Sequence, residues 1–286
     1  MQNKLLKLVL TLLLLIGAGI FLYPRFSGYI EHIRQAQVIE NYRDASDSIT
    51  AKIQEKMRKD AEAYNRKLAE QPDFDHAVAI ARAQYSKEYD RLLDTGDNGV
   101  MGSISIPKIG VELPLYHGTQ ERDLARGVGH YEGTSLPVGG ESTHTVLSGH
   151  RGLPSADLFT RLDEVEEGDL FVINTLGEDL TYRVDQIKTV LPDQTDDLAI
   201  VAGKDYATLV TCTPYGINTH RLLIRGERTE NLTEEEQKEL KETKEKEDRT
   251  LERLLESGAL VLVILAVTGI IIWRVRRKAK KQESER

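Results

Sequence analysis

The sequence predicts a mainly β protein, a barrel or a sandwich, with a helical segment before the β domain and a membrane-spanning helix on each side. Three observations support this fold class. Short β-type runs separated by turns fill residues 101–226, apolar residues recur every three or four positions over residues 28–70, and two uncharged apolar stretches lie near the ends of the 286-residue chain. We expect six parts. The first three are a cytoplasmic start with the first anchor at 1–27, a helical appendage at 28–98 and the β domain at 99–227. They are followed by a charged helical stalk at 228–256, a second transmembrane helix at 257–273 and a basic cytoplasmic tail at 274–286.

The first apolar stretch, residues 8–23, carries no charge and follows Lys4 and Lys7. With the two leucines before it, the stretch approaches the roughly 20 residues that a bilayer core requires. A cleaved signal peptide has a similar pattern, but this stretch is longer than a usual signal core and no clear cleavage motif of small residues follows it. The pattern therefore favours an uncleaved anchor.

The second apolar stretch, residues 257–273, stops at a basic cluster, because residues 274–286 carry seven basic and two acidic side chains. Basic flanks favour the cytoplasmic side of a membrane. A buried core helix is the alternative, which the abrupt basic stop disfavours. We expect a two-pass protein of the cell membrane, with both termini cytoplasmic and the β domain outside the cytoplasm.

The net charge of −8 combines basic ends with an acidic segment between the two apolar stretches. An acidic surface repels phosphates, so nucleic acid is excluded as a partner, and the basic ends are expected to lie at the lipid bilayer. The acidic pairs Glu166-Glu167 and Asp196-Asp197 fall in expected loops, where solvated charge is a simpler explanation than a metal site. We expect no metal and no cofactor.

The helical segment has one apolar stripe over residues 28–70. Such a stripe requires a partner surface, which we expect to be the β domain, with a helix pair standing alone as the alternative. Pro72 interrupts the pattern, and helix is expected to resume over residues 77–93 before turn residues end it.

Seven β-type runs follow, with a short helix expected at 155–163. Seven or eight strands with few helices suggest a barrel or sandwich. The runs are 102–106, 111–116, 144–148, 170–174, 180–187, 207–212 and 220–225.

Cys212 is the only cysteine, which excludes an intramolecular disulfide framework and a multi-cysteine zinc site. It ends the run ATLVTC and precedes TPYG, so its thiol is expected where a strand passes into a turn, a common location for reactive groups. A free cysteine is usually a small buried hydrophobe. Outside the cytoplasm a retained thiol risks oxidation, which favours a chemical role as a nucleophile.

A cysteine nucleophile needs a base or a cation that supplies its thiolate form. His150 ends the run TVLSGHRG between two glycines that permit an exposed turn, which makes it the best candidate among the seven histidines. His220 is expected to point away from the site by strand alternation. The other five are His32 and His76 in the helical segment and His117, His130 and His144 in the β domain.

Arg221 lies nine residues after Cys212, so a hairpin would place its guanidinium beside the sulfur. Acyl transfer develops negative charge on a carbonyl oxygen, which a fixed cation stabilises. A solvated charge on an edge strand is the alternative for Arg221. Cys212, His150 and Arg221 together favour thiol acyl transfer.

At these residues the sequence resembles the sortases, the cysteine transpeptidases of Gram-positive cell surfaces. The run TLVTCTPYGINTHRLLIRG resembles the family's cysteine signature and arginine strand, and STHTVLSGHRG resembles the strand that ends in its histidine. The runs GVMGSISIPKIGVELPLYHGT and GVGHYEGTSLPVGGES extend the resemblance over residues 99–226. It implies the eight-stranded sortase β-barrel.

The resemblance implies that Cys212 is the nucleophile, His150 the general acid and base, and Arg221 the stabiliser of substrate and oxyanion. Cys212 would attack the Thr–Gly bond of a Leu-Pro-x-Thr-Gly-like sorting signal, and His150 would protonate the departing amine. Another amine would then resolve the thioacyl enzyme. The expected partners are pilin or surface-protein substrates and an acceptor amine from a pilin lysine or a wall precursor.

The long helical segment and the second apolar stretch are similar to class C sortases, which polymerise pilins. The alternatives are a housekeeping sortase that anchors proteins to a peptidoglycan precursor, and a non-catalytic peptide-binding module, which would lack one of the three residues. Class C sortases also carry a lid with an Asp-Pro-aromatic motif. Here Pro72-Asp73-Phe74 inverts its first two residues. Asp73 and Phe74 are candidate lid residues, with a plain interhelix turn as the alternative.

Overall fold

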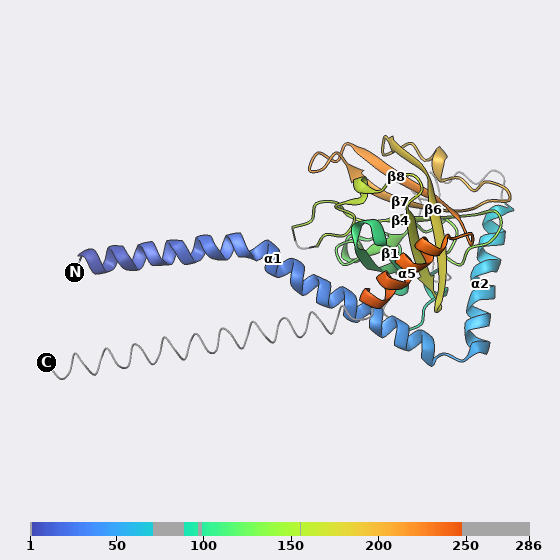
Figure 1. Cartoon of the computed structure of the whole chain (residues 1–286), viewed down its shortest axis with the longest axis horizontal. Helices are drawn as coiled ribbons and strands as arrows, with labels where there is room; N and C mark the ends of the chain where they lie inside the picture. The colour runs from blue at the N-terminus through green and yellow to red at the C-terminus, as the bar shows by residue number, and fades with distance from the viewer. Residues whose placement is uncertain (1, 71–88, 97–98, 155, 248–286) are drawn as a thin grey trace. The chain divides into compact units, whose positions relative to one another are not determined.

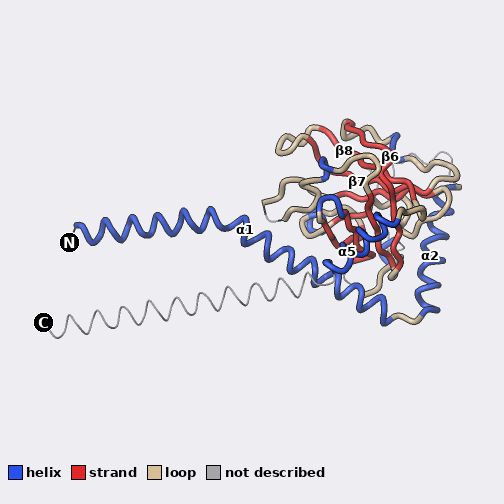
Figure 2. Tube along the Cα trace, in the orientation of Figure 1, coloured by secondary structure: helices blue, strands red, loops and turns tan. Residues whose placement is uncertain are grey.

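The computed structural model describes residues 2–70, 89–96, 99–154 and 156–247. Eight strands in this part of the chain close into a β-barrel, which confirms the barrel and excludes the sandwich. They are β1 (Val100–Ile106), β2 (Val111–His117), β3 (Val128–His130), β4 (Thr143–Ser148), β5 (Leu170–Thr175), β6 (Glu178–Val190), β7 (Asp205–Thr213) and β8 (His220–Arg228). Their order around the barrel is β1-β2-β3-β4-β7-β8-β6-β5. Figures 1 and 2 show the strands gathered into one body, in which β7 lies beside β8.

Two strand pairs are parallel, β2 with β3 and β4 with β7, and the other neighbours are antiparallel. Parallel neighbours end at the same edge of a sheet. β4 and β7 therefore reach the same end of the barrel. This arrangement matters for function because His150 follows β4 and Cys212 lies near the end of β7.

The barrel interior is filled by apolar side chains that alternate with outward-facing ones. Leu147, Leu209 and Ile224 are fully buried and come from three neighbouring strands, as the two-residue period of a strand requires. Every predicted β-type run falls within an observed strand. The sequence did not predict β3, which has three residues and is too short to show a period.

The predicted helix over residues 155–163 is wrong for the residues that are described. Residues 156–161 form turns and an isolated bridge, and a single 3-10 turn, η3, spans Leu162–Glu164. Leu158 has a φ of 40°, which a right-handed helix cannot contain. Leu158 and Phe159 are buried in the main core, so tertiary packing overrides the helical spacing of these residues.

Two helices precede the barrel, α1 (Gln2–Ser48) and α2 (Ala51–Ala69) (Figure 1). The single helix predicted over residues 28–70 is therefore interrupted at residues 49–50. The side-chain amide of Gln54 donates to the carbonyl of Ser46 at 2.8 Å and connects the two helices across the break.

Within the part of the chain that the structure describes, no helix is both long enough and apolar enough to cross a membrane. The predicted transmembrane helix 257–273 and the basic tail 274–286 lie outside the described residues.

The helical segment packs on the barrel, as expected, and does not stand alone. The hydroxyl of Tyr42 donates to the carbonyl of Met101 at 3.0 Å and accepts from the N–H of Leu176 at 2.8 Å. Burial raises the pKa of Tyr42 to about 12, against the opposing effect of the bond from Leu176. On α2, the Asn65 amide exchanges two hydrogen bonds with the backbone of Leu136, at 3.0 and 2.7 Å.

The short helix η1 (Tyr89–Arg91) is anchored by a buried hydrogen-bond chain. The Tyr89 hydroxyl accepts from the N–H of Gly118 at 3.1 Å and lies 2.7 Å from Nδ1 of His130. Nε2 of His130 lies 2.8 Å from the carbonyl of Ser135. A carbonyl can only accept, so the imidazole proton is on Nε2, and Nδ1 accepts from Tyr89. Burial lowers the pKa of His130 to about 4.

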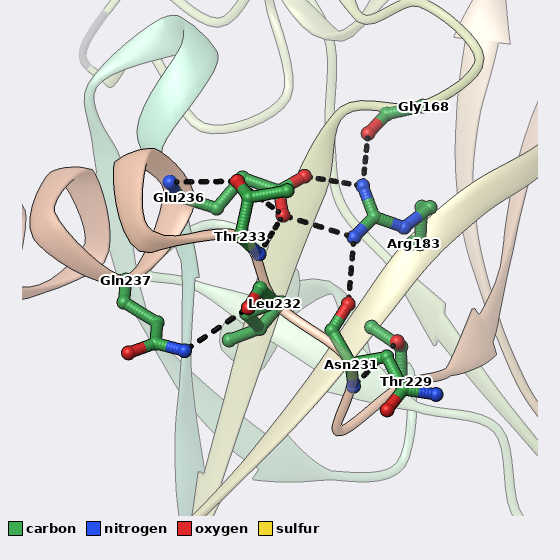
Figure 3. A network of polar contacts seen from close by, with 8 residues as sticks. All are labelled: Gly168, Arg183, Thr229, Asn231, Leu232, Thr233, Glu236 and Gln237. Carbon is green, nitrogen blue, oxygen red and sulfur yellow. Dashed lines mark hydrogen bonds and ion pairs between the residues drawn. The ribbon is translucent and has the colours of Figure 1, made fainter.

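The described part of the predicted stalk contains α5 (Glu234–Glu247), which begins with a capping box. Thr233 Oγ1 accepts from the N–H of Glu236 at 3.2 Å, and the Glu236 carboxylate accepts from the N–H of Thr233 at 2.8 Å. The same carboxylate pairs with Arg183 of β6 through two contacts (Figure 3). The hydrogen bond from Arg183 is the main reason that the pKa of Glu236 falls to about 2. The start of α5 is thus fixed to the barrel.

Candidate active site

Cys212 and Arg221 are directly paired across β7 and β8. Directly opposite residues of an antiparallel pair point to the same face of the sheet, so the thiol and the guanidinium are neighbours on one face. The Arg221 guanidinium also donates to the carbonyls of Asn218 and His220, at 3.3 and 3.1 Å. His220 pairs with Thr213 and points to the opposite face, as strand alternation predicts.

His150 is placed by the parallel pairing of β4 and β7, whose last pair is Ser148 with Val210. The pairing continues beyond the end of β4, because the N–H of Gly149 donates to the carbonyl of Val210 at 3.1 Å. Continuing this register from the Ser148–Val210 pair by two residues puts the backbone of His150 opposite that of Cys212. The strand register therefore places His150, which follows β4, at the same end of the barrel as Cys212 and Arg221 on β7 and β8.

The turn that presents His150 requires a glycine before it. A Cβ at Gly149 would lie 2.6 Å from a ring carbon of Phe159, closer than van der Waals contact allows. The hydroxyl of Thr211 donates to the carbonyl of Gly149 at 2.8 Å and holds the same turn from β7. The backbone ahead of His150 is thus held by a buried ring and a hydrogen bond.

Glu121 contacts the imidazole of His150. Both of its carboxylate oxygens lie 3.2 Å from Nε2, and the His150 side chain is 27% exposed. Glu121 begins α4 (Glu121–Leu124), between β2 and β3. Sequence reasoning missed this residue, because an exposed glutamate on a four-residue helix has no periodic pattern or motif around it.

Arg151 is the second residue that sequence reasoning missed. Its Nη1 donates to Oγ1 of Thr213 at 3.2 Å, its Nη2 lies 2.6 Å from Asp163, and its side chain is 7% exposed. A buried guanidinium requires such partners. The signal available in the sequence was its position, directly after His150.

An apolar cluster lies on the same face of the sheet as the thiol. Val210 is two residues before Cys212 and pairs with Leu223, which is two residues after Arg221. These side chains share the face of the catalytic candidates because side chains alternate along a strand. The cluster comprises Val146, Leu198, Val210 and Leu223, with Tyr131 and Val190 packed against it.

Tyr131 connects this cluster to the polar residues. Burial raises the pKa of Tyr131, whereas a hydrogen bond with Ser148 and the positive charge of Arg221 oppose this effect. Cys212 is also close enough to influence the Tyr131 hydroxyl electrostatically. The site thus combines a thiol, an imidazole and a guanidinium, a set of groups suited to acyl transfer, and it lies beside a buried apolar cluster.

Comparison with known proteins identifies the family. The family model for the sortase domain matches residues 104–229. The crystal structure of sortase C1 from Streptococcus agalactiae is 46% identical, and the match covers 68% of this chain and 100% of that one with a TM-score of 0.62. The chain belongs to the sortase family. Members of this family are cysteine transpeptidases, and the fold expected from the resemblance is confirmed.

Two further relatives of this sortase show how far the similarity extends. A structure described as a pilus-related sortase C of group B Streptococcus is 42% identical, over 66% of this chain and 96% of that one, with a TM-score of 0.59. Sortase D of Bacillus subtilis is 38% identical over 131 residues, which are 44% of this chain and 63% of the relative. The chain thus spans less than two thirds of this curated relative.

The other histidines of the sortase barrel serve its structure. His144 contacts the Ala199 carbonyl at 2.8 Å and the Thr208 hydroxyl at 2.7 Å, and His117 contacts the Leu92 carbonyl at 2.6 Å. His117, His130 and His144 are all buried. His32, on α1, is half-exposed and lies 3.4 Å from Asp157.

The remaining predicted positions do not add to the site. Glu166 lies 3.5 Å from Lys108, and Asp197 lies 2.5 Å from Lys188, consistent with loop charges that pair at the surface. Among the described residues of this sortase, no group of three or more His, Cys, Asp or Glu side chains could hold a metal ion. The candidate lid residues Asp73 and Phe74, together with His76, lie outside the described residues.

Proposed function

We propose that this sortase cleaves a Leu-Pro-x-Thr-Gly-like sorting signal between Thr and Gly and joins the threonine to a lysine amine of another pilin subunit. The observation that carries the proposal is the strand register, which pairs Cys212 with Arg221 and extends to His150. The similarity to a pilus-related sortase C supports the choice of pilins as substrates.

The reaction follows from the chemistry of the three side chains. The Cys212 thiol passes its proton to His150 and its sulfur attacks the threonine carbonyl carbon to form a C–S bond, while Arg221 stabilises the negative charge on the carbonyl oxygen. His150 gives a proton to the glycine nitrogen as the C–N bond breaks. A lysine amine then attacks the thioester and loses a proton to His150. The sulfur leaves as the new amide bond forms.

The apolar cluster supports the proposed substrate class. Val210 and Leu223 lie two residues along their strands from Cys212 and Arg221, toward the middle of the sheet. Both side chains are buried, so a Leu-Pro segment located ahead of the scissile bond would contact the partly buried Tyr131 and Val190 that pack against them. Transfer of such a segment from water gains roughly 25 cal/mol per Å² of apolar surface that is buried. The variable residue of the signal is left open.

A housekeeping sortase, which transfers its substrate to a peptidoglycan precursor, is the second candidate function. Two helices ahead of the barrel, with Tyr42 and Asn65 packed on it, favour the class C proposal, as does the similarity to class C structures. A non-catalytic peptide-binding module is disfavoured, because it has no need for an adjacent thiol, imidazole and guanidinium.

The proposal includes a location. The chain would be anchored in the cell membrane of a Gram-positive bacterium by the apolar stretches 8–23 and 257–273, with both termini cytoplasmic and the barrel outside. The proposed six-part division of the chain would place the barrel at residues 99–227, between the helical appendage and the stalk.

The proposal also retains a lid formed by Asp73 and Phe74. A lid that occupies the site would slow peptide cleavage. Replacing both residues with alanine should therefore accelerate cleavage several-fold, measured with a fluorogenic sorting-signal peptide. An unchanged rate would favour the plain interhelix turn.

The decisive experiment for pilin polymerisation uses the full-length protein in detergent with candidate pilins. The expected product is a ladder of covalent oligomers that resists denaturing detergent. Cys212→Ala should abolish both the ladder and the thioester-linked peptide adduct, and either product in this variant would contradict the mechanism. Peptide cleavage without any ladder, together with transfer to a peptidoglycan-type amine, would favour the housekeeping function.

A further inference from the structure

The Glu121 carboxylate faces one specific nitrogen of the His150 ring. Both of its oxygens lie 3.2 Å from Nε2, and the His150 ring makes no other hydrogen bond among the contacts of the described residues. An ionised carboxylate can only accept hydrogen bonds. The contact therefore requires that Nε2 carries a proton.

We propose that Glu121 is a positioning residue for His150, which holds the imidazole with its proton on Nε2 and leaves Nδ1 to exchange protons with Cys212 and the substrate. The inference rests on the proposed role of His150 as general acid and base. It adds a fourth residue, from α4, to Cys212, Arg221 and His150.

The proton balance of the reaction fits this assignment. In the neutral ring Nε2 bears the only proton, so the Nδ1 lone pair takes the proton of the Cys212 thiol as the sulfur attacks. Nδ1–H then donates that proton to the departing glycine nitrogen. The Nε2–H bond to Glu121 is kept through both steps, so the ring does not need to rotate between them.

The surroundings of the two residues leave Glu121 as the group that sets the orientation of the ring. The nearby Arg151 is engaged by Thr213 and Asp163, and Arg122 of α4 lies 3.2 Å from Asp123. Glu121 itself is 79% exposed, so solvent screens its charge. An exposed pair of this kind has a small effect, which corresponds to a rate change of about two- to fivefold.

The test compares full-length wild-type protein with Glu121→Gln and Glu121→Asp, and uses Glu167→Gln as a control. Glu167 is exposed, and its replacement makes the same change in charge. One readout is the ¹⁵N NMR spectrum of histidine-labelled protein, in which the two ring tautomers have different nitrogen shifts. His150→Gln assigns the signal. The second readout is cleavage of a sorting-signal peptide without an amine acceptor, with kcat and KM determined separately.

We expect Glu121→Gln to convert the His150 signal from an Nε2–H pattern to a mixture of tautomers. Its kcat should fall about two- to fivefold with KM unchanged. Glu121→Asp should recover part of both effects, and Glu167→Gln should match the wild type. An unaltered tautomer pattern and kcat in Glu121→Gln would overturn the proposal. A loss confined to transfer to an added amine would also overturn it and would indicate recruitment of the acceptor.

The NMR readout separates this inference from the proposed function. It needs neither substrate nor turnover, so it reports on Glu121 even if the wild-type protein fails to cleave the peptide. Failure of cleavage in the wild type would count against the proposed function alone.

Discussion

Arg151 donates a hydrogen bond from Nη1 to Oγ1 of Thr213 at 3.2 Å, which joins the residue after His150 to the residue after Cys212. Its other terminal nitrogen lies 2.6 Å from Asp163, and Nε donates to the carbonyl of Thr160 at 3.2 Å. A planar guanidinium can hold several acceptors in fixed directions. Arg151 therefore fixes the distance between the two strand ends that present the imidazole and the thiol.

Arg151→Lys should lower kcat for peptide cleavage about tenfold or more, because an ammonium cannot reproduce the three directed contacts and small displacements of reacting groups are costly. Steady-state kinetics with a fluorogenic peptide measure the effect. Arg122→Lys is the matched control, since the Arg122 side chain is 75% exposed. An equal loss of kcat in Arg151→Lys and Arg122→Lys would contradict a specific role for Arg151.

Arg221→Ala should reduce kcat/KM by about 10²- to 10³-fold, the usual loss when one donor to an oxyanion is removed. The Cys212 thiol should still react with a small alkylating reagent, because its strand does not depend on the guanidinium. Arg225→Ala, on the same strand, removes a cation that pairs with Asp185 instead. Similar kinetics for the two variants would argue against oxyanion stabilisation by Arg221.

Tyr42→Phe should destabilise the protein by about 1–3 kcal/mol, because it leaves the carbonyl of Met101 and the N–H of Leu176 without their shared partner in the core. Thermal unfolding followed by circular dichroism measures the change. Tyr215→Phe is the control, since Tyr215 is 59% exposed. If Tyr42→Phe unfolded at the same temperature as the wild type, this contact of α1 would contribute little to the stability of the barrel.

Stability should fall as the pH is lowered from about 6.5 to 4, with His130 as one cause. The pKa of His130 is about 4 in the folded protein and close to the ordinary histidine value of 6.5 when unfolded, so the unfolded chain binds the proton first. Denaturant unfolding at several pH values measures the slope. His130→Gln should have a lower free energy of unfolding at neutral pH, and this free energy should depend less on pH between 6.5 and 4. If the dependence on pH were the same as in the wild type, His130 would be excluded as a cause.

The local parts of the site could be predicted from the sequence. Cys212 and Arg221 are separated by a short hairpin, so their spacing alone predicted that they are neighbours. His150 could only be ranked above the other histidines, because its place depends on the parallel pairing of β4 with β7 between residues 62 positions apart. Strand periodicity identifies each strand but does not determine which distant strand pairs with it.

The predictions from the sequence that were wrong or incomplete also failed because of tertiary contacts. The predicted helix at 155–163 failed because Leu158 adopts a left-handed φ while the apolar residues around it fill the core. The break at residues 49–50 was missed because the apolar spacing continues through it, from Tyr42 to Ala61. Glu121 was missed because a single side-chain contact across the surface leaves no trace in local spacing.

The parallel pairing of β4 with β7 has a consequence for the evolution of the enzyme. The spacing of thiol and imidazole depends on two adjacent strand ends and on the contacts of Arg151 with Thr160, Asp163 and Thr213, and not on the rest of the chain that connects the two strands. Segments such as the turn between β5 and β6, or the connection between β6 and β7, can gain or lose residues while the reacting groups keep their separation. New substrate preferences can therefore arise by insertion and deletion, with the catalytic distance inherited unchanged.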